Sequence, residues 1–203
     1  MTSADFARLV RTLRRAATGR ADIGRWAALA SLDPSWDERT RLIADLVPGG
    51  SRVIEFGAGR RVLERLLDPS CRYIPSDVVS RGPGTLVYDL DARPLPDLSP
   101  LAPDVAVFAG VFEYLNRLSS IPPWLSRHVA VCIASYNCAR TPRRGGGRLR
   151  ERCARAQIGW VNTLTEEELV ALFAGSGFRC EKKLIWCTPD GDEPIFVFRQ
   201  GAR

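Results

Sequence analysis

The sequence predicts an α/β protein built on a mostly parallel sheet with helices on both faces. Residues 52–67 contain a β-branched strand, a turn with Gly57 and Gly59, and a run with helical spacing. The near-continuous apolar run at residues 104–109 suits a parallel strand covered on both faces. A capped helix and two further strand patterns follow towards the C-terminus.

Length and composition favour one globular core. At 203 residues, we expect a sheet domain over residues 51–203 and an N-terminal helical extension over residues 1–50. No apolar run approaches the roughly 18 residues that cross a bilayer, so we expect no transmembrane segment. A secretory leader pattern is also missing, and the six cysteines form no Cys-x-x-Cys pair, so we expect a reducing cytoplasm and no metal site.

The positive charge raises the question of nucleic-acid binding. The net charge is +6, but all of the 29 basic residues except Lys182 and Lys183 are arginine. Surfaces that bind phosphates more often mix both residue types, each for its own geometry, so this ratio looks like genomic base composition. Nucleic acid therefore remains the lesser alternative as a partner.

Two helices are expected before the first strand. Residues 4–17 form a basic amphipathic pattern whose apolar residues share one face: Phe6, Leu9, Val10 and Leu13. We favour a helix that docks on the domain, with a membrane-surface or partner-binding helix next and a transit peptide third. A second helix is expected over residues 37–46, ahead of a Pro-Gly-Gly break.

Acidic residues follow the second and third predicted strands. The strand pattern at residues 72–76 ends at Asp77, about 20 residues after the glycine turn. An acid in this place is suited to accept hydrogen bonds from both hydroxyls of a ribose. The strand pattern at residues 85–88 ends at Asp89. We therefore predict a nucleoside-binding crevice at the carboxyl edge of the sheet.

The connections around the third strand are expected to be loops. Residues 78–84 are fewer than the dozen or so residues of a helical crossover. Residues 92–103 contain four prolines, which exclude a long helix. The sheet should therefore be thinly covered near its third strand.

The fourth and fifth strands bring further polar residues to the same edge. After the strand at residues 104–109 and the strand at residues 129–135, the chain presents Gly110, Glu113, Tyr114, Tyr136 and Asn137. Ligand sites of open α/β sheets lie at the carboxyl ends of strands. His128 precedes its strand and should lie at the opposite edge, so we do not expect it to act as a general base.

The C-terminal third begins with an arginine- and glycine-rich stretch at residues 140–155. We expect a loop there, either covering the site and binding an anionic group or simply solvated. Thr165 and Glu168 then form a capping box for a helix within residues 163–174. Two strand patterns, at residues 179–186 and 195–199, are joined by a polar turn.

Four matches in order resemble the class I S-adenosylmethionine-dependent methyltransferases. Residues 55–59, Glu-Phe-Gly-Ala-Gly, are similar to the family's motif I, and Asp77, residues 89–91 and residues 104–115 follow in the expected places. The resemblance covers residues 51–198 and implies a Rossmann-like fold that ends in an antiparallel hairpin. Arg61 departs from the pattern, because many relatives have a third glycine there.

The resemblance also implies roles for individual residues. For S-adenosyl-L-methionine as cofactor it assigns Glu55, Phe56, Gly57, Ala58, Gly59, Asp77, Asp89, Leu90 and Gly110, with Asp91 competing for the place of Asp89 near the adenine. Candidate substrate residues are Tyr114, Asn137, Trp160 and Asn162. Glu113 is the first candidate for a general base and Tyr136 the second, unless the acceptor needs no base.

These expectations describe a methyltransferase that acts on an oxygen of a small molecule or glycan, for which the arginines would suit an anionic group. The alternatives are an RNA or protein methyltransferase, an NAD-dependent oxidoreductase that would use Asp77 for its own ribose, and an inactive methyltransferase-like binding module. The identity of the acceptor and the oligomeric state do not follow from the sequence.

Overall fold

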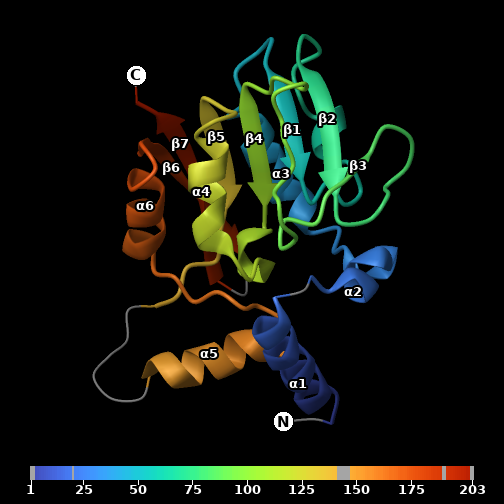
Figure 1. The fold of residues 1–203 in the computed structure, drawn as a ribbon, viewed down its shortest axis with the longest axis vertical. Coiled ribbons are helices and arrows are strands. Elements are labelled where there is room, and N and C mark those ends of the chain that lie inside the picture. Colours follow the sequence, from blue (N-terminus) through green and yellow to red (C-terminus); the bar gives the residue numbers. More distant parts are fainter. Residues whose placement is uncertain (1–2, 20, 141–146, 189–190, 202–203) are drawn as a thin grey trace.

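A computed structural model describes residues 3–19, 21–140, 147–188 and 191–201. Its centre is a seven-stranded sheet in the order β3-β2-β1-β4-β5-β7-β6 (Figure 1). The strands are β1 (Arg52–Phe56), β2 (Arg72–Asp77), β3 (Leu86–Val87), β4 (Val105–Ala109), β5 (Val131–Ser135), β6 (Phe178–Thr188) and β7 (Gly191–Gln200). Strand β7 is antiparallel to both neighbours, whereas β1 to β5 pair in parallel. The expected mostly parallel sheet with a C-terminal hairpin is confirmed.

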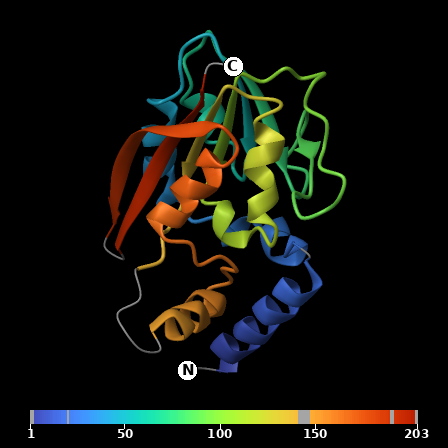
Figure 2. The same cartoon turned by 60° about the vertical axis from the view of Figure 1, so that its left-hand side comes forward.

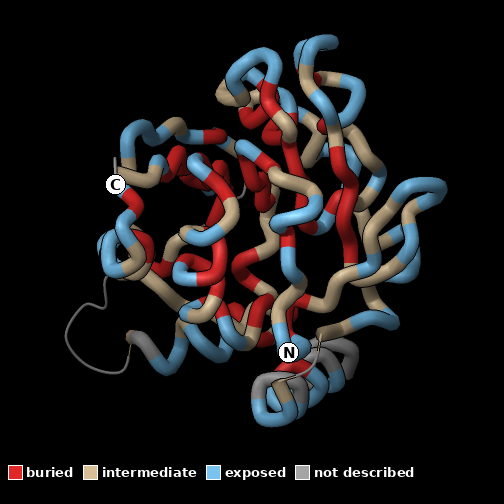
Figure 3. Tube along the Cα trace, turned by 45° about the horizontal axis from the view of Figure 1, so that its top comes forward, coloured by how far each residue is buried: buried red, intermediate tan, exposed pale blue. Residues whose placement is uncertain are grey.

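Helices cover both faces of the sheet, as expected. The helices of the described residues are α1 (Ser3–Thr18), α2 (Ile23–Ala27), α3 (Trp36–Ala44), α4 (Ile121–Leu125), α5 (Gly147–Gln157) and α6 (Glu166–Ala174), with short 3-10 turns between them. Helices α4 and α6 enclose one core with the sheet, and α3 encloses the other. Buried residues follow the strands, while exposed ones gather in the connections (Figure 3).

Strand β1 shows how the sequence builds the two cores. Val53 belongs to the core beneath α3, whereas Ile54 and Phe56 belong to the core beneath α4 and α6. This alternation follows from the two-residue period of a strand. Every residue of β5 is buried, as expected for a central strand with both faces covered.

The prediction of a helix after the glycine turn is wrong. Residues 62–67 form only the 3-10 turn η2 (Leu63–Arg65). Gly57, Gly59 and Arg61 all adopt positive φ, so the turn extends to Arg61. Pro69 disfavours helical backbone at Asp68, which leaves too little chain for two helical turns. The loops expected at residues 78–84 and 92–103 are confirmed.

The chain near α5 also differs from the expectation. Residues 147–157 form α5 rather than a loop, because Arg, Leu, Glu, Ala and Gln favour helix there. The rest of the arginine-rich stretch, at residues 141–146, lies outside the described residues. The capping box at Thr165 and Glu168 is confirmed at the start of α6.

Helix α1 forms as expected but packs differently. It lies against α5 below the sheet rather than on it (Figures 1 and 2). Thr12 is buried, whereas Val10 and Leu13, on the expected docking face, are 46% and 56% exposed. Two of the apolar residues on the expected docking face are therefore largely exposed. None of the described helices is long and apolar enough to span a bilayer.

The stacking of α6 on β7 should dominate the stability of its core. Phe173 is fully buried, with its ring centroid 3.9 Å from that of Phe198. We expect Phe173→Ala to lower the free energy of unfolding by about 3–5 kcal/mol, because it removes a buried aromatic ring and leaves a cavity. Urea denaturation measures this. The control Leu149→Ala, at a 68% exposed position, should change it by about 0.5 kcal/mol or less. Equal losses in the two variants would contradict this packing.

Candidate functional site

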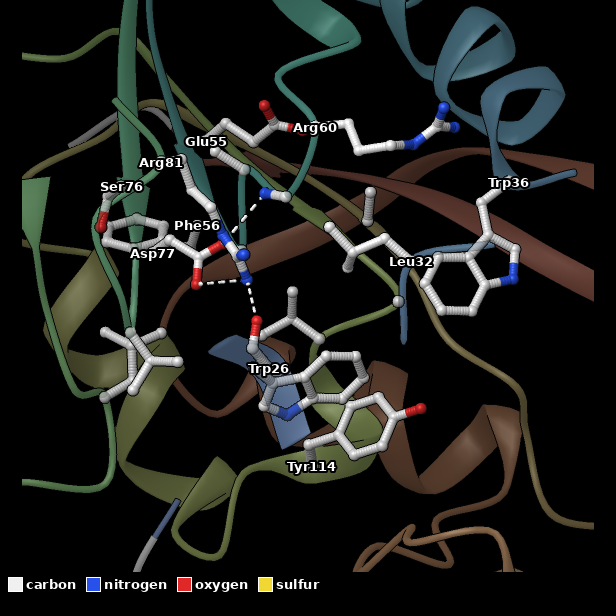
Figure 4. A pocket seen from close by; sticks show the side chains of 18 of the residues that line it. Trp26, Leu32, Trp36, Glu55, Phe56, Arg60, Ser76, Asp77, Arg81 and Tyr114 are labelled. Carbon is white, nitrogen blue, oxygen red and sulfur yellow. Dashed lines mark hydrogen bonds and ion pairs between the residues drawn. The ribbon is translucent and has the colours of Figure 1, made fainter. Parts of the chain in front are cut away.

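A cleft opens at the carboxyl ends of β1, β2 and β4, where parallel sheets bind ligands (Figure 4). Its empty space amounts to about 1060 Å³ when the open mouth is included. The glycine corner, residues 55–59, and Asp77 form its inner wall. Trp26 and Tyr114 close one side, and Leu32 and Trp36 close another, so residues from before the sheet complete the cleft (Figure 4).

The glycine corner has the backbone that its sequence requires. Gly57 and Gly59 have φ values of +75° and +51°. A Cβ on Gly57 would lie 2.6 Å from Cγ2 of Val111, so only glycine fits. The Ala58 amide donates to the Ser76 carbonyl at 3.0 Å, which fixes the corner to β2.

Arg61, which stands where the sequence resemblance leads us to expect a third glycine, takes the left-handed conformation that glycine favours, with φ +55°. Its guanidinium donates to the Pro83 carbonyl at 2.9 Å and to Glu64 at 2.8 Å. Arg61 is not among the described residues that line the cleft. The departure from the sequence pattern therefore leaves the cleft open.

Asp77 is the polar centre of the cleft. Its Oδ2 accepts hydrogen bonds from the Gly59 amide and from Nε of Arg81, both at 2.9 Å. The side chains of Asp77 and Arg81 are each 4% exposed. Arg81 also donates to the Trp26 carbonyl at 2.5 Å, so the guanidinium spans the cleft (Figure 4). Sequence reasoning missed Arg81, although it follows a strand-end acid by four residues.

Glu55 lies buried beside the glycine corner and accepts a hydrogen bond from the Tyr73 hydroxyl. Burial raises the pKa of Glu55 to about 8, with a further contribution from the negative charge of Asp77. The carboxyl group is therefore mostly protonated at neutral pH. Phe56, the next residue, packs its ring against Phe108 on the other side of the sheet, 4.8 Å between centroids.

The two acids after β3, Asp89 and Asp91, differ in their hydrogen bonds. Asp91 is buried and accepts hydrogen bonds from the backbone and side-chain amides of Asn116 at 2.8 and 2.6 Å. Burial raises the pKa of Asp91. Asp89, Leu90 and Asp91 all line the cleft, and Asp89 accepts a hydrogen bond from the Asp91 amide at 2.9 Å. Asp91 also holds the turn through its two hydrogen bonds from Asn116, so Asp89 is the acid with fewer contacts inside the protein.

Arg39 is a second residue that sequence reasoning missed. It leaves α3, lines the cleft, and donates to Glu193 at 3.0 Å and to the Ala109 carbonyl at 3.2 Å. Its guanidinium lies between the rings of Trp36 and Trp186, 5.6 and 5.5 Å from their centroids. Nε of Arg39 is buried and has no hydrogen-bond partner among the described residues. An arginine on the sheet-facing side of the predicted helix was the available signal.

Arg39 also explains the glycine after β4. A Cβ on Gly110 would lie 2.5 Å from the Arg39 guanidinium. The Gly110 amide donates to Oγ of Ser135 at 2.9 Å. Gly110, which also lines the cleft, therefore lets the arginine approach the end of β4.

The two candidates for a base are buried, and neither is among the described residues that line the cleft. Glu113 accepts a hydrogen bond from the Asn137 amide at 2.7 Å, while its Oε2 is buried with no described partner. Burial, and then the charge of Glu193, raises the pKa of Glu113 to about 7. The Tyr136 hydroxyl accepts hydrogen bonds from the Leu164 amide and from Arg155, and burial raises its pKa above the usual range.

Of the candidate substrate residues, Tyr114 lines the cleft. Its hydroxyl accepts a hydrogen bond from Trp160 at 3.0 Å, so Trp160 forms a second layer behind it. Asn162 donates to the carbonyls of Phe112 and Leu115 at 2.6 and 2.7 Å and so holds the turn that carries Tyr114. Asn137 and Asn162 are outside the described lining and support it through Glu113 and this turn.

No family model matches the chain, and no curated protein is significantly similar in sequence. Solved structures do match. The Burkholderia thailandensis 1,6-didemethyltoxoflavin-N1-methyltransferase, with its substrate and S-adenosylhomocysteine bound, is 14% identical at a TM-score of 0.64, over 100% of this chain and 92% of its own.

Two further structures show the range of the fold. Human N-acetylserotonin methyltransferase in complex with S-adenosylmethionine is 12% identical at a TM-score of 0.61, over 98% of this chain and 67% of its own. The 4+2 cyclase SpnF is 13% identical at a TM-score of 0.53, over 82% of this chain and 81% of its own. The chain therefore has the fold of the class I S-adenosylmethionine-dependent methyltransferases.

Proposed function

We propose that the protein is an S-adenosylmethionine-dependent methyltransferase that acts on an oxygen of a small molecule or glycan. The observation that carries this proposal is the buried carboxylate of Asp77, held at the end of β2 by the Gly59 amide. In this fold such an acid can accept hydrogen bonds from both ribose hydroxyls. The small molecules named for two structural neighbours support a small-molecule acceptor.

The other end of the cleft offers groups for the amino-acid part of the cofactor. Glu55 provides a carboxyl group for an ammonium ion, and Arg39, which lines the cleft, provides a positive charge for a carboxylate. Asp89 would face the adenine. These assignments orient a cofactor from β3 to the glycine corner along the carboxyl edge of the sheet.

The residues needed for the transfer itself are few. A sulfonium already activates its methyl group, so the protein chiefly has to hold the acceptor in line and exclude water. Tyr114 is the acceptor-wall candidate that lines the cleft. An acceptor hydroxyl must also lose a proton, and a base works best with a pKa near the working pH. Glu113 has such a pKa, and as the base it would have to reach the acceptor from behind the present wall.

A second candidate function is a binding module that has lost methyl transfer. The buried ion pair of Asp77 with Arg81 favours it, because the protein itself occupies both oxygens of the ribose acid. The fold alone does not decide, since SpnF, a cyclase, shares it. Cofactor binding separates the two.

Replacing the ribose acid should remove cofactor binding. We expect Asp77→Ala to weaken S-adenosylhomocysteine binding by roughly 10- to 100-fold, because hydrogen bonds to a charged acceptor are lost. Isothermal titration calorimetry measures it, with Asp97→Ala, an exposed acid at the opposite edge, as the control. Titration with NAD tests the oxidoreductase alternative. Well-folded wild-type protein that binds NAD but no S-adenosylhomocysteine would contradict the proposal.

Cofactor binding should release a proton. The pKa of Glu55 is about 8 in the empty cleft, and an ammonium ion beside it would lower that pKa. Between about pH 6 and pH 8 the affinity should therefore rise with pH and then level off. Calorimetry in buffers of different ionisation enthalpy should show up to one proton released at pH 7, and Glu55→Gln should abolish it. Heats that do not depend on the buffer would refute this role.

The raised pKa of Glu113 should be visible in stability. A carboxyl whose pKa rises from 4.5 to about 7 on folding stabilises the folded state only while it keeps its proton. The free energy of unfolding should therefore fall by about 1 kcal/mol per unit as pH rises from about 5 to 7. Urea denaturation of wild type against Glu113→Gln isolates this slope, because the amide still accepts from Asn137. Parallel pH curves for the two proteins would show that Glu113 is already ionised.

A further inference from the structure

The guanidinium of Arg81 stands where ribose hydroxyls would have to bind. It contacts Oδ2 of Asp77 through Nε at 2.9 Å and Oδ1 through Nη2 at 3.4 Å. The remaining contacts of this carboxylate come from the amides of Gly59 and Val79. A ribose could reach the same oxygens only if Arg81 withdrew.

Arg81 also holds α2 in place. Its Nη2 donates to the Trp26 carbonyl at 2.5 Å, which lies on the far side of the cleft from Asp77 (Figure 4). Trp26 meets Tyr114 edge to face, with 4.7 Å between ring centroids. The cleft is thus closed beside Tyr114 as long as Arg81 bridges the two walls.

Helix α2 has few other attachments. None of its five residues is buried. Beside Trp26 in the same helix, Arg25 donates to the Ile158 carbonyl at 2.8 Å and lies 4.7 Å from the Trp26 ring centroid. Polar contacts of two arginines therefore attach α2 to the rest of the protein, whereas buried apolar side chains attach α3 and α6. Segments attached in this way open at low free-energy cost.

We propose that Arg81 is a latch that couples cofactor binding to opening of the cleft, an inference that rests on the proposed function. The ribose hydroxyls take over the carboxylate of Asp77, and Arg81 withdraws. α2 then loses one of its two arginine contacts and gives way beside Tyr114, where the acceptor enters. Binding is therefore ordered, with the cofactor first and the acceptor second.

The latch should lower the affinity of the protein for its cofactor. In the empty protein the cofactor competes with Arg81, so its apparent affinity is reduced by the fraction of molecules in which Asp77 is accessible. Removing Arg81 leaves the Asp77 carboxylate buried without its partner, which further favours a ligand that can donate to it. Loss of this arginine should therefore strengthen cofactor binding.

The direct test is calorimetric titration of S-adenosylhomocysteine into wild type, Arg81→Ala and Arg61→Ala. We expect about tenfold tighter binding to Arg81→Ala and wild-type affinity for Arg61→Ala. Arg61→Ala is a matched control because it removes the same charge from a guanidinium that contacts the loop of residues 78–84 but does not line the cleft. Arg81→Lys, which keeps the charge but not the planar fork, should lie between wild type and Arg81→Ala.

Trypsin cleavage after Arg25 provides the second readout, and it also serves if Arg81→Ala folds poorly. S-adenosylhomocysteine should accelerate this cleavage several-fold in wild type and in Arg61→Ala. In Arg81→Ala, cleavage should be fast without ligand. Protection of Arg25 by the ligand in wild type would overturn the latch, because it would mean that α2 closes on the cofactor.

The outcomes separate the latch from the proposed function. Equal affinity of wild type and Arg81→Ala overturns the latch and leaves the cofactor assignment intact. Weaker binding to Arg81→Ala also overturns it, by making Arg81 part of the cofactor site. Binding only to Arg81→Ala overturns the latch, because the cofactor then does not displace Arg81 in wild type, and it favours the inactive binding module. If no folded variant binds S-adenosylhomocysteine, the proposed function fails and the latch fails with it.

Discussion

The carboxylate of Asp77 is the point on which the cleft depends. It receives the Gly59 amide from the glycine corner, the Val79 amide from its own loop and the guanidinium of Arg81. A buried carboxylate is tolerated only when such donors replace its water. The strand end, the corner and, through Arg81, the cover of the cleft are therefore fixed to one another by a single charged group.

A second buried network lies at the other side of β4. Arg39 supplies positive charge to Glu193 and is enclosed by two tryptophan rings, while Glu113 lies close enough to Glu193 for the two charges to interact. Burial makes a charged carboxyl group costly here, and a single guanidinium balances only one of the two negative charges. Glu113 therefore tends to keep its proton, which is why its pKa is raised. Such arrangements cluster at functional sites, although structural ion pairs also produce them. The network therefore gives the cleft charge that a zwitterionic ligand can use.

The sequence was most informative where local rules decide the outcome. The β-branched residues of β1 and the near-continuous apolar run of β4 predicted the parallel sheet, and Thr165 with Glu168 predicted the start of α6. Strand-end acids could be placed because their position in the chain fixes their edge of the sheet. The missing helix after the glycine corner was predictable only in hindsight, from Pro69 and the left-handed Arg61.

The sequence did not predict the direction of side chains or the distant partners of long arginine side chains. Glu113 was expected in the cleft, but the 3-10 turn at Phe112–Tyr114 directs Tyr114 to the cleft and leaves Glu113 behind its wall. Arg39 and Arg81 act on partners far away in the chain, Glu193 and Trp26. A flexible arginine has many partners within reach, so tertiary packing selects among them.

A crystal structure of the protein with S-adenosylhomocysteine would show the exchange of partners at Asp77 directly. We expect both ribose hydroxyls within hydrogen-bond distance of the Asp77 carboxylate, with the Arg81 guanidinium withdrawn from it. A ligand bound elsewhere, with the contact between Asp77 and Arg81 intact, would contradict this exchange.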